Sequence, residues 1–97
     1  MPAEIEQDER DVTAVHGLSR DDAGRVVATG RLLLDAAGPG TAVVGRMAAD
    51  ADVRGRGHGA AVLAVLERAA ADRGQRVVEL HAQVTARGFY ELSLIHI

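Results

Sequence analysis

The sequence contains no cysteine, no lysine and no tryptophan, and Phe89 and Tyr90 are its only aromatic residues. Without cysteine the chain has no disulfide, no thiolate metal site and no cysteine nucleophile. With so few aromatic rings, the core has to be built from Val, Leu and Ala. No apolar run approaches the ~20 residues of a membrane span, and the acidic first eleven residues lack a signal-peptide pattern. These absences predict a cytoplasmic protein with no membrane partner.

Charge and length narrow the class of protein further. All 11 basic residues are Arg, and the net charge is -3. A nucleic-acid binder needs a basic face to displace counterions from phosphates, so no nucleic-acid partner is expected. The four histidines, at positions 16, 58, 81 and 96, show no metal-ligand spacing, and no metal is expected. A length of 97 residues allows one domain.

The first half of the chain is predicted to form an antiparallel β-meander. Residues 1–13 are dense in carboxylates and are expected as a solvated acidic segment. Strands are predicted over residues 14–18, 25–34 and 41–47, where Val and Leu gather. Asp, Ser and Gly in residues 19–24, and Gly and Pro in residues 35–40, predict the turns between them. Short turns between consecutive strands favour antiparallel pairing.

The second half is predicted to contain a βαβ unit. Apolar residues recur at helical spacing over residues 58–73, and Gly74 is a good helix stop. A short strand is predicted over residues 77–81, and another helix over residues 85–92. The order of strand, glycine-rich loop, helix and strand predicts two parallel strands with a right-handed crossover. The expected fold class is therefore α/β (α+β), an antiparallel meander followed by a βαβ unit in a mixed sheet with helices packed on it.

The loop before the long helix, residues 53–60 with the sequence V-R-G-R-G-H-G-A, carries the chemistry. A helix N-terminus exposes backbone N–H groups without intrahelical partners, and the helix dipole favours negative charge there. Glycines at 55, 57 and 59 remove the Cβ atoms that would keep an anion away from these groups. Arg54 and Arg56 add positive charge suited to phosphate. The pattern predicts an anion cradle, for which a diphosphate is the natural ligand.

Other interpretations of the loop stay open. A flexible connector could also be rich in glycine. A Walker loop is excluded because no Gly-Lys-Ser/Thr follows. Gly55, Gly57 and Ala60 satisfy the dinucleotide pattern G-x-G-x-x-A, and Glu79 lies at about the distance of a ribose-binding acid. Against this interpretation, six residues separate the predicted strand from the loop, and a meander precedes the unit.

The same loop resembles the coenzyme-binding motif of the GNAT superfamily of N-acetyltransferases, Arg/Gln-x-x-Gly-x-Gly/Ala. Residues 54–59 fit this motif in full. Residues 44–49 resemble the fourth strand of these enzymes and residues 77–83 the fifth. Residues 86–91 resemble the start of a helix that bears the family's A-x-x-F-Y-E signature.

The resemblance implies an enzyme that transfers acetyl from acetyl-coenzyme A, its co-substrate, to a primary amine by direct attack in a ternary complex. The fourth and fifth strands are then expected to splay apart. The backbone of Met47, Ala48 and Ala49 is expected to pair with the pantetheine arm, and Gln83 stands where many relatives carry an Asn that bonds this arm. The pyrophosphate is expected at the amides of Arg54, Gly55, Arg56, Gly57, His58, Gly59 and Ala60.

Three residues are candidates for catalysis. Tyr90 matches the tyrosine that often protonates the departing thiolate in this family, and a phenol held near the sulfur is a usable proton donor. The alternative for Tyr90 is a ring that fills space beside Phe89. Glu79 and His81, two residues apart on one face of a predicted strand, are candidates for the general base. Side chains of these types on strands are more often ion-paired or exposed.

Compared with the family, the chain (residues 1–97) is expected to be one incomplete acetyltransferase domain. The first strand and the helices that normally precede the meander have no counterpart, and residues 92–97 are expected to be a non-native tail. Exposed sheet edges and an uncovered apolar face favour aggregation or a homodimer. Other hypotheses are a non-catalytic fragment that binds coenzyme A or another nucleotide, a dinucleotide-binding module, and a fragment that does not fold.

Overall fold

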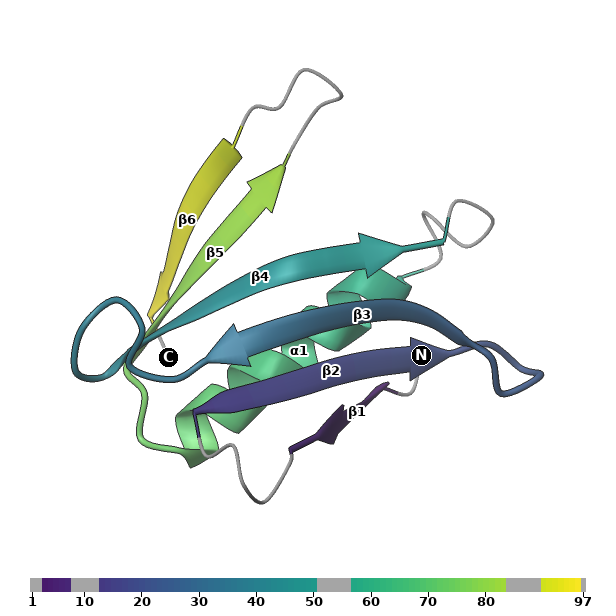
Figure 1. Cartoon of the computed structure of the whole chain (residues 1–97), viewed down its shortest axis with the longest axis horizontal. Helices are drawn as coiled ribbons and strands as arrows, with labels where there is room; N and C mark the ends of the chain where they lie inside the picture. The colour runs from purple at the N-terminus through teal and green to yellow at the C-terminus, as the bar shows by residue number, and fades with distance from the viewer. Residues whose placement is uncertain (1–2, 8–12, 51–56, 84–89, 97) are drawn as a thin grey trace.

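One mixed sheet with a helix on one face makes up the computed structural model, which describes residues 3–7, 13–50, 57–83 and 90–96 (Figure 1). The strands follow the sheet in chain order, and every neighbouring pair is antiparallel except β4 and β5, which are parallel. The elements are β1 (Ala3–Glu6), β2 (Ala14–Arg20), β3 (Val26–Leu33), β4 (Thr41–Ala49), α1 (His58–Asp72), β5 (Val77–Gln83) and β6 (Tyr90–His96). The predicted meander, the βαβ unit and the fold class are confirmed.

The N-terminal segment differs from its prediction. Residues Ala3–Glu6, expected to be solvated, form β1 and pair with β2 from Ala3↔Ser19 to Glu6↔His16. Three of the four residues are exposed, so the carboxylates stay in water while the backbone pairs. Glu4 accepts a hydrogen bond from Arg20 of the neighbouring strand at 2.8 Å. A strand therefore precedes the meander, where none was expected.

The C-terminal segment also differs. Residues 90–92 were expected in a helix, but Tyr90–His96 forms β6, which pairs with β5 from Val77↔His96 to Gln83↔Tyr90. An unpaired β5 edge would leave a row of backbone groups without partners, and antiparallel pairing with β6 satisfies them. This long-range gain outweighs the local helical pattern. Residues 85–89 of the predicted helix lie outside the described residues.

Helix α1 covers one face of β1 to β4 (Figure 1). Its fully or nearly fully buried apolar residues are Val62, Leu66, Ala69 and Ala70. A Cβ atom at Gly17 would lie 3.1 Å from Leu66 carbons, so this glycine allows the helix to approach β2 closely. As the composition predicts, the buried apolar side chains of the described residues are all Val, Leu or Ala.

The helix ends where the sequence predicts. Gly74 has φ 80, in the left-handed region that favours glycine. Its N–H donates to Ala71 O at 3.1 Å, and the Gln75 N–H donates to Ala70 O at 3.0 Å. These two bonds form a Schellman motif that satisfies the last helical carbonyls. In the described part of the chain, no helix has both the length and the apolarity needed to cross a membrane.

We expect Leu66→Ala to lower the free energy of unfolding by about 2–5 kcal/mol, because it leaves a cavity between α1 and the sheet. Urea unfolding followed by circular dichroism measures the change. Arg68→Ala is the control, since that side chain is exposed on the same helix, and it should cost no more than ~0.5 kcal/mol. Equal effects of the two substitutions would contradict this packing of α1.

Candidate functional site

Strands β4 and β5 start side by side and then diverge. Their parallel pairing runs only from Thr41↔Val77 to Val44↔Leu80, although β4 continues to Ala49 and β5 to Gln83. Figure 1 shows the two strands opening like a V from their shared start. The sequence-based expectation that these strands splay apart is confirmed.

A β-bulge in β4 accounts for the divergence. Thr29 pairs with Ala48 and Arg31 pairs with Gly45, so two residues of β4, Arg46 and Met47, face Gly30 alone on β3. Arg46 has φ 54, a left-handed conformation that costs a non-glycine residue about 1–3 kcal/mol. A bulge bends its strand and increases its twist. Here it directs β4 away from β5 immediately after their last pair.

The bulge places Met47, Ala48 and Ala49 on a strand segment with one open edge. Ala48 and Ala49 pair with β3 on one side. On the β5 side, no strand among the described residues pairs with residues 45–49. Backbone N–H and C=O groups on an open edge are a template for an added extended chain.

The start of α1 lies beside the end of β4 (Figure 1). Gly57 is the N-cap residue, with φ 85, and no side chain of the described residues caps the helix. The first intrahelical bond goes from Ala61 N to Gly57 O at 2.9 Å, so the N–H groups of His58, Gly59 and Ala60 have no intrahelical partner. The first turn contains no acidic residue. Gly57, His58, Gly59 and Ala60 therefore meet the requirements of an anion site. Arg54, Gly55 and Arg56 lie outside the described residues.

A buried hydrogen bond fixes this first turn to the sheet. Ser19 Oγ and His58 Nδ1 are 2.7 Å apart, and the two residues are 0% and 4% exposed. The proton belongs to either group, according to the tautomer of the ring. The glycine-rich pattern places His58 in the loop but does not indicate Ser19, because no local pattern links residues 39 positions apart.

The predicted catalytic residues lie on β5 and β6, the last two strands of the sheet. Glu79, in β5, is half-buried and pairs in register with Val43 and Leu94. His81 and Gln83 follow on β5, beyond its last pair with β4. Tyr90 begins β6 opposite Gln83, so its predicted helical setting is wrong. The structure does not describe the side chains of His81, Gln83 and Tyr90, and their roles stay predictions.

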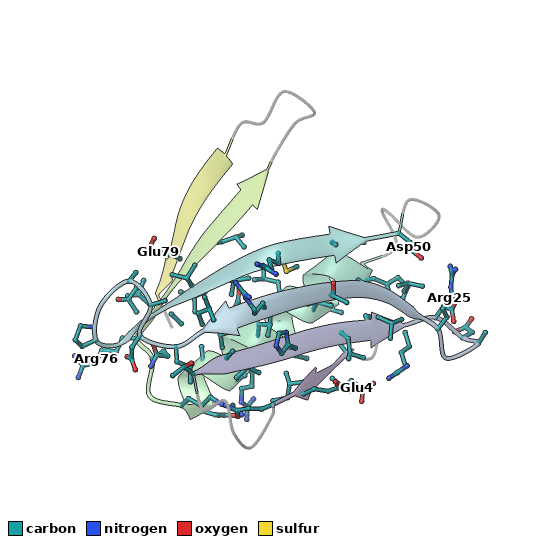
Figure 2. All side chains as sticks on the ribbon, in the orientation of Figure 1. Glu4, Arg25, Asp50, Arg76 and Glu79 are labelled. Carbon is teal, nitrogen blue, oxygen red and sulfur yellow. The ribbon has the colours of Figure 1, made fainter. Side chains whose placement is uncertain are left out.

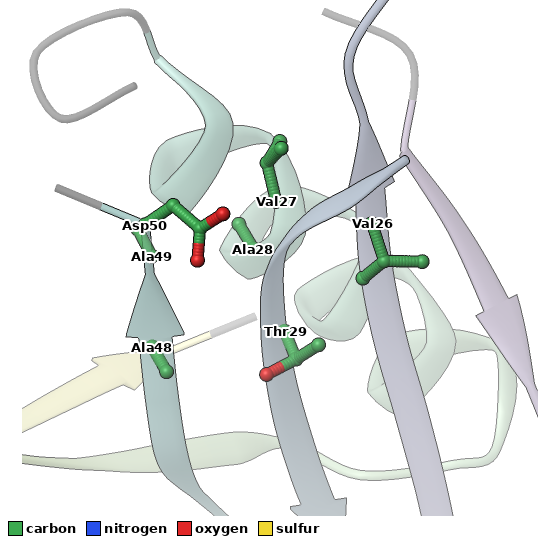
Figure 3. A pocket seen from close by; sticks show the side chains of 7 residues that line it. All are labelled: Val26, Val27, Ala28, Thr29, Ala48, Ala49 and Asp50. Atoms are coloured by element: carbon green, nitrogen blue, oxygen red, sulfur yellow. The ribbon is translucent and has the colours of Figure 1, made fainter. Parts of the chain in front are cut away.

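A hollow of about 140 Å³ lies on the other side of β4, between residues 26–29 of β3 and residues 48–50 (Figure 3). Asp50 at its rim pairs with Arg25 at 3.2 Å, which ties the end of β4 to the start of β3 (Figure 2). The hollow is smaller than the ~300–1,000 Å³ of ordinary ligand pockets. The candidate site is instead the open edge of β4 with the helix start, where backbone groups lack strand or helix partners among the described residues.

Where β4 and β5 begin, three groups hold the strands together. Gly40 O accepts hydrogen bonds from Arg76 N at 2.7 Å and Val77 N at 3.2 Å. The Asp35 carboxylate accepts from Gly40 N at 2.8 Å and from the Gln75 side chain at 3.1 Å. The bond from Gly40, followed by that from Gln75, lowers the pKa of the Asp35 carboxyl below its ordinary value. This network forms the vertex of the V.

Comparison with solved structures finds the same fold in proteins described as acyl- or acetyltransferases. A Klebsiella pneumoniae protein assigned as an acyl-CoA N-acyltransferase is 25% identical, with a TM-score of 0.67 over 77% of this chain and 50% of its own. An aminoglycoside 6'-N-acetyltransferase complexed with coenzyme A (15% identity, TM-score 0.66, 75% of this chain and 39% of its own) has the same fold. Glucosamine-6-phosphate N-acetyltransferase from Arabidopsis thaliana also has this fold. It is 21% identical, with a TM-score of 0.65 over 74% of this chain and 52% of its own.

The model of the acetyltransferase (GNAT) family matches residues 1–94. The chain therefore belongs to this family, which confirms the resemblance stated from the glycine loop. It spans about half the length, or less, of the three solved relatives above. A search of curated proteins found no significant match. The mixed sheet of this family differs from the doubly wound sheet that the dinucleotide-binding alternative requires.

We expect Ser19→Ala to destabilise the fold by about 1–3 kcal/mol, because His58 Nδ1 loses its buried partner. A double-mutant cycle with His58→Ala, measured by urea unfolding, isolates the pair. A coupling of about 1 kcal/mol is expected for a buried hydrogen bond. Strictly additive effects would show that the two side chains do not interact.

Asp35→Asn should lower stability at neutral pH and have less effect in acid. A carboxyl whose pKa is lower in the folded chain stabilises that chain above its unfolded pKa. The contribution is lost as the pH falls through the folded value, here below about 4. Urea midpoints from pH 7 to pH 2.5 test this, with exposed Asp22→Asn as a control for charge. A difference between wild type and Asp35→Asn that does not shrink at low pH would contradict the assignment.

Proposed function

We propose that this chain binds acetyl-coenzyme A and transfers its acetyl group to a primary amine in a ternary complex. The observation that carries the proposal is the open edge of β4 at residues 45–49, next to the uncapped start of α1. An extended pantetheine arm contains amides that suit such an edge, and a pyrophosphate suits a helix N-terminus. The two features lie at the same end of β4, as one ligand with both parts requires.

The coenzyme would be held along β4 and at the helix start. The backbone of Met47, Ala48 and Ala49 would pair with the pantetheine arm. The amides of residues 54–60, of which Gly57, His58, Gly59 and Ala60 are described, would bind the pyrophosphate. Gln83, on the facing part of β5, would bond the same arm from the other side.

The reaction needs a base and an acid. The amine has to lose a proton before it attacks the thioester carbonyl, and Glu79 or His81 would accept this proton directly or through water. The C–N bond then forms as the C–S bond breaks, and the thiolate leaves with a proton from Tyr90. Of the three candidates, Glu79 is the one whose side chain the structure describes, and it is half-buried on β5. No metal takes part in this scheme.

We also propose an acceptor class and a cellular location for the reaction. The acceptor would be a small molecule or peptide with a primary amine, in the cytoplasm, without nucleic-acid or membrane partners. A second function, coenzyme A binding without turnover, is separated from the first by a thiol-release assay. Binding that persists while no amine stimulates thiol release would favour the second.

Gly57→Ala tests the coenzyme site. Its φ of 85 makes alanine strained by about 1–2 kcal/mol, and relief of that strain would move the N-terminal amides of α1. We expect the Kd for coenzyme A, measured by isothermal titration, to rise about tenfold. Gly24→Ala is the matched control, because Gly24 has the same φ of 85, with nothing within 4 Å of an added Cβ at either position.

The control lies in the β2–β3 turn, so it should cost similar stability and leave coenzyme A affinity unchanged. An unchanged Kd in Gly57→Ala, or an equal loss in both variants, would argue against the helix start as the pyrophosphate site. No coenzyme A binding by the wild-type chain at millimolar ligand would overturn the proposed function itself.

A further inference from the structure

The face of the sheet that α1 leaves uncovered contains a second hollow, of about 190 Å³, next to the bulge. It is lined by His16 of β2, Thr29, Gly30 and Arg31 of β3, and Arg46 of β4. Neither the motif in residues 54–59 nor the coenzyme site uses any of these side chains. The hollow is small, and its size suits a single carboxylate or phosphate group.

Strand geometry explains why the basic side chains gather there. A Cβ atom on Gly30 would meet Met47 and Leu66, so this position faces α1. Its neighbour Arg31 therefore points to the opposite face, because side chains alternate along a strand. His16 pairs in register with Arg31 and shares that face. The bulge adds Arg46 to the same group.

The positive charge of this hollow is not neutralised by the described residues. Arg31 is half-buried and Arg46 is exposed, and neither forms an ion pair with a described residue. Three other arginines, by contrast, pair with carboxylates: Arg20, Arg25 and Arg68. Glu6 of β1 pairs in register with His16 and so lies on the same face, but it is one strand further from Arg31 and forms no ion pair with a described residue. A chain with net charge -3 thus maintains a local basic site.

The hollow lies next to groups that are proposed to take part in the reaction. Arg46 immediately precedes Met47, so the hollow adjoins the open edge of β4. Glu79 lies on the same face, since its register partner Val43 alternates with the buried Val44, which faces α1. A strained Arg46 (φ 54) at this point is the kind of backbone conformation that persists at functional sites.

We propose that the hollow of His16, Arg31 and Arg46 binds an anionic group of the acceptor, and that the acceptor is therefore an amine that also carries a carboxylate or a phosphate. This inference rests on the proposed function. Arg46 and Arg31 hold the anionic group by charge-assisted hydrogen bonds. The amine end of the same molecule then lies towards Glu79 and the diverging part of β4 and β5.

A matched set of three amines tests the acceptor class: β-alanine with a carboxylate, phosphoethanolamine with a phosphate, and ethanolamine with neither. Each has a primary amine on a two-carbon chain. Thiol release from acetyl-coenzyme A gives kcat/KM, and titration of each amine into the coenzyme-A-loaded protein gives its Kd. We expect one or both anionic amines to exceed ethanolamine by roughly tenfold in either measurement, and the better of the two identifies the anion.

Arg31→Gln and Arg46→Gln connect the preference to the hollow. Each should raise KM or Kd for the anionic amine roughly tenfold, while the values for ethanolamine and acetyl-coenzyme A stay the same. Arg68→Gln, which removes an exposed charge from α1, is the control and should change none of them.

Ethanolamine used or bound as well as both anionic amines would overturn the inference even if coenzyme A binds. A rise in KM for acetyl-coenzyme A in the Arg31 and Arg46 variants would also overturn it, because the hollow would then serve the coenzyme. If coenzyme A does not bind, the proposed function fails, and amine titrations of the free protein still test the hollow. Equal Kd values for all three amines would then reject it.

Discussion

The parallel pairing of β4 and β5 over four residue pairs, and its abrupt end, is the constraint on which the rest of the structure depends. The Asp35, Gly40 and Gln75 network fastens the two strands where they begin. The bulge at Arg46 then bends β4 away. A ladder without the bulge would continue to pair and would close the edge at which the coenzyme is proposed to bind. The two strands are thus joined where they begin and separated where they end.

Unpaired backbone groups on a strand edge inside a sheet destabilise the fold unless water or a ligand bonds to them. The backbone groups of residues 45–49 on the β5 side have no strand partner among the described residues, and each such group needs water or a ligand. A ligand that binds only the folded chain adds stability in proportion to the logarithm of its concentration over Kd. The acetyl donor would therefore act as a missing strand, supporting the same geometry that it needs for reaction.

Local sequence patterns predicted the elements that short-range interactions determine. Val and Leu runs predicted β2 to β5, helical spacing predicted α1, and Gly74 predicted its end, because turn and cap residues act over a few positions. The bulge at Arg46 and the Ser19–His58 bond depend on contacts across the sheet, and no sequence spacing encodes them. Tyr90 shows the same limit of local patterns. The signature around it predicted a helix, but this residue begins a strand that pairs with β5.

In the proposed reaction, co-substrate and acceptor would bind on opposite faces of the sheet. The uncapped start of α1 and the side chain of Met47 lie on the helix face, while Glu79, Arg31 and His16 lie on the opposite face. A thioester held along β4 would be accessible to an amine only where β4 and β5 have separated, because paired strands block passage between faces. Direct attack across this separation needs no acyl-enzyme intermediate. Two ligands on opposite faces would also bind without competing, as the proposed ternary complex requires.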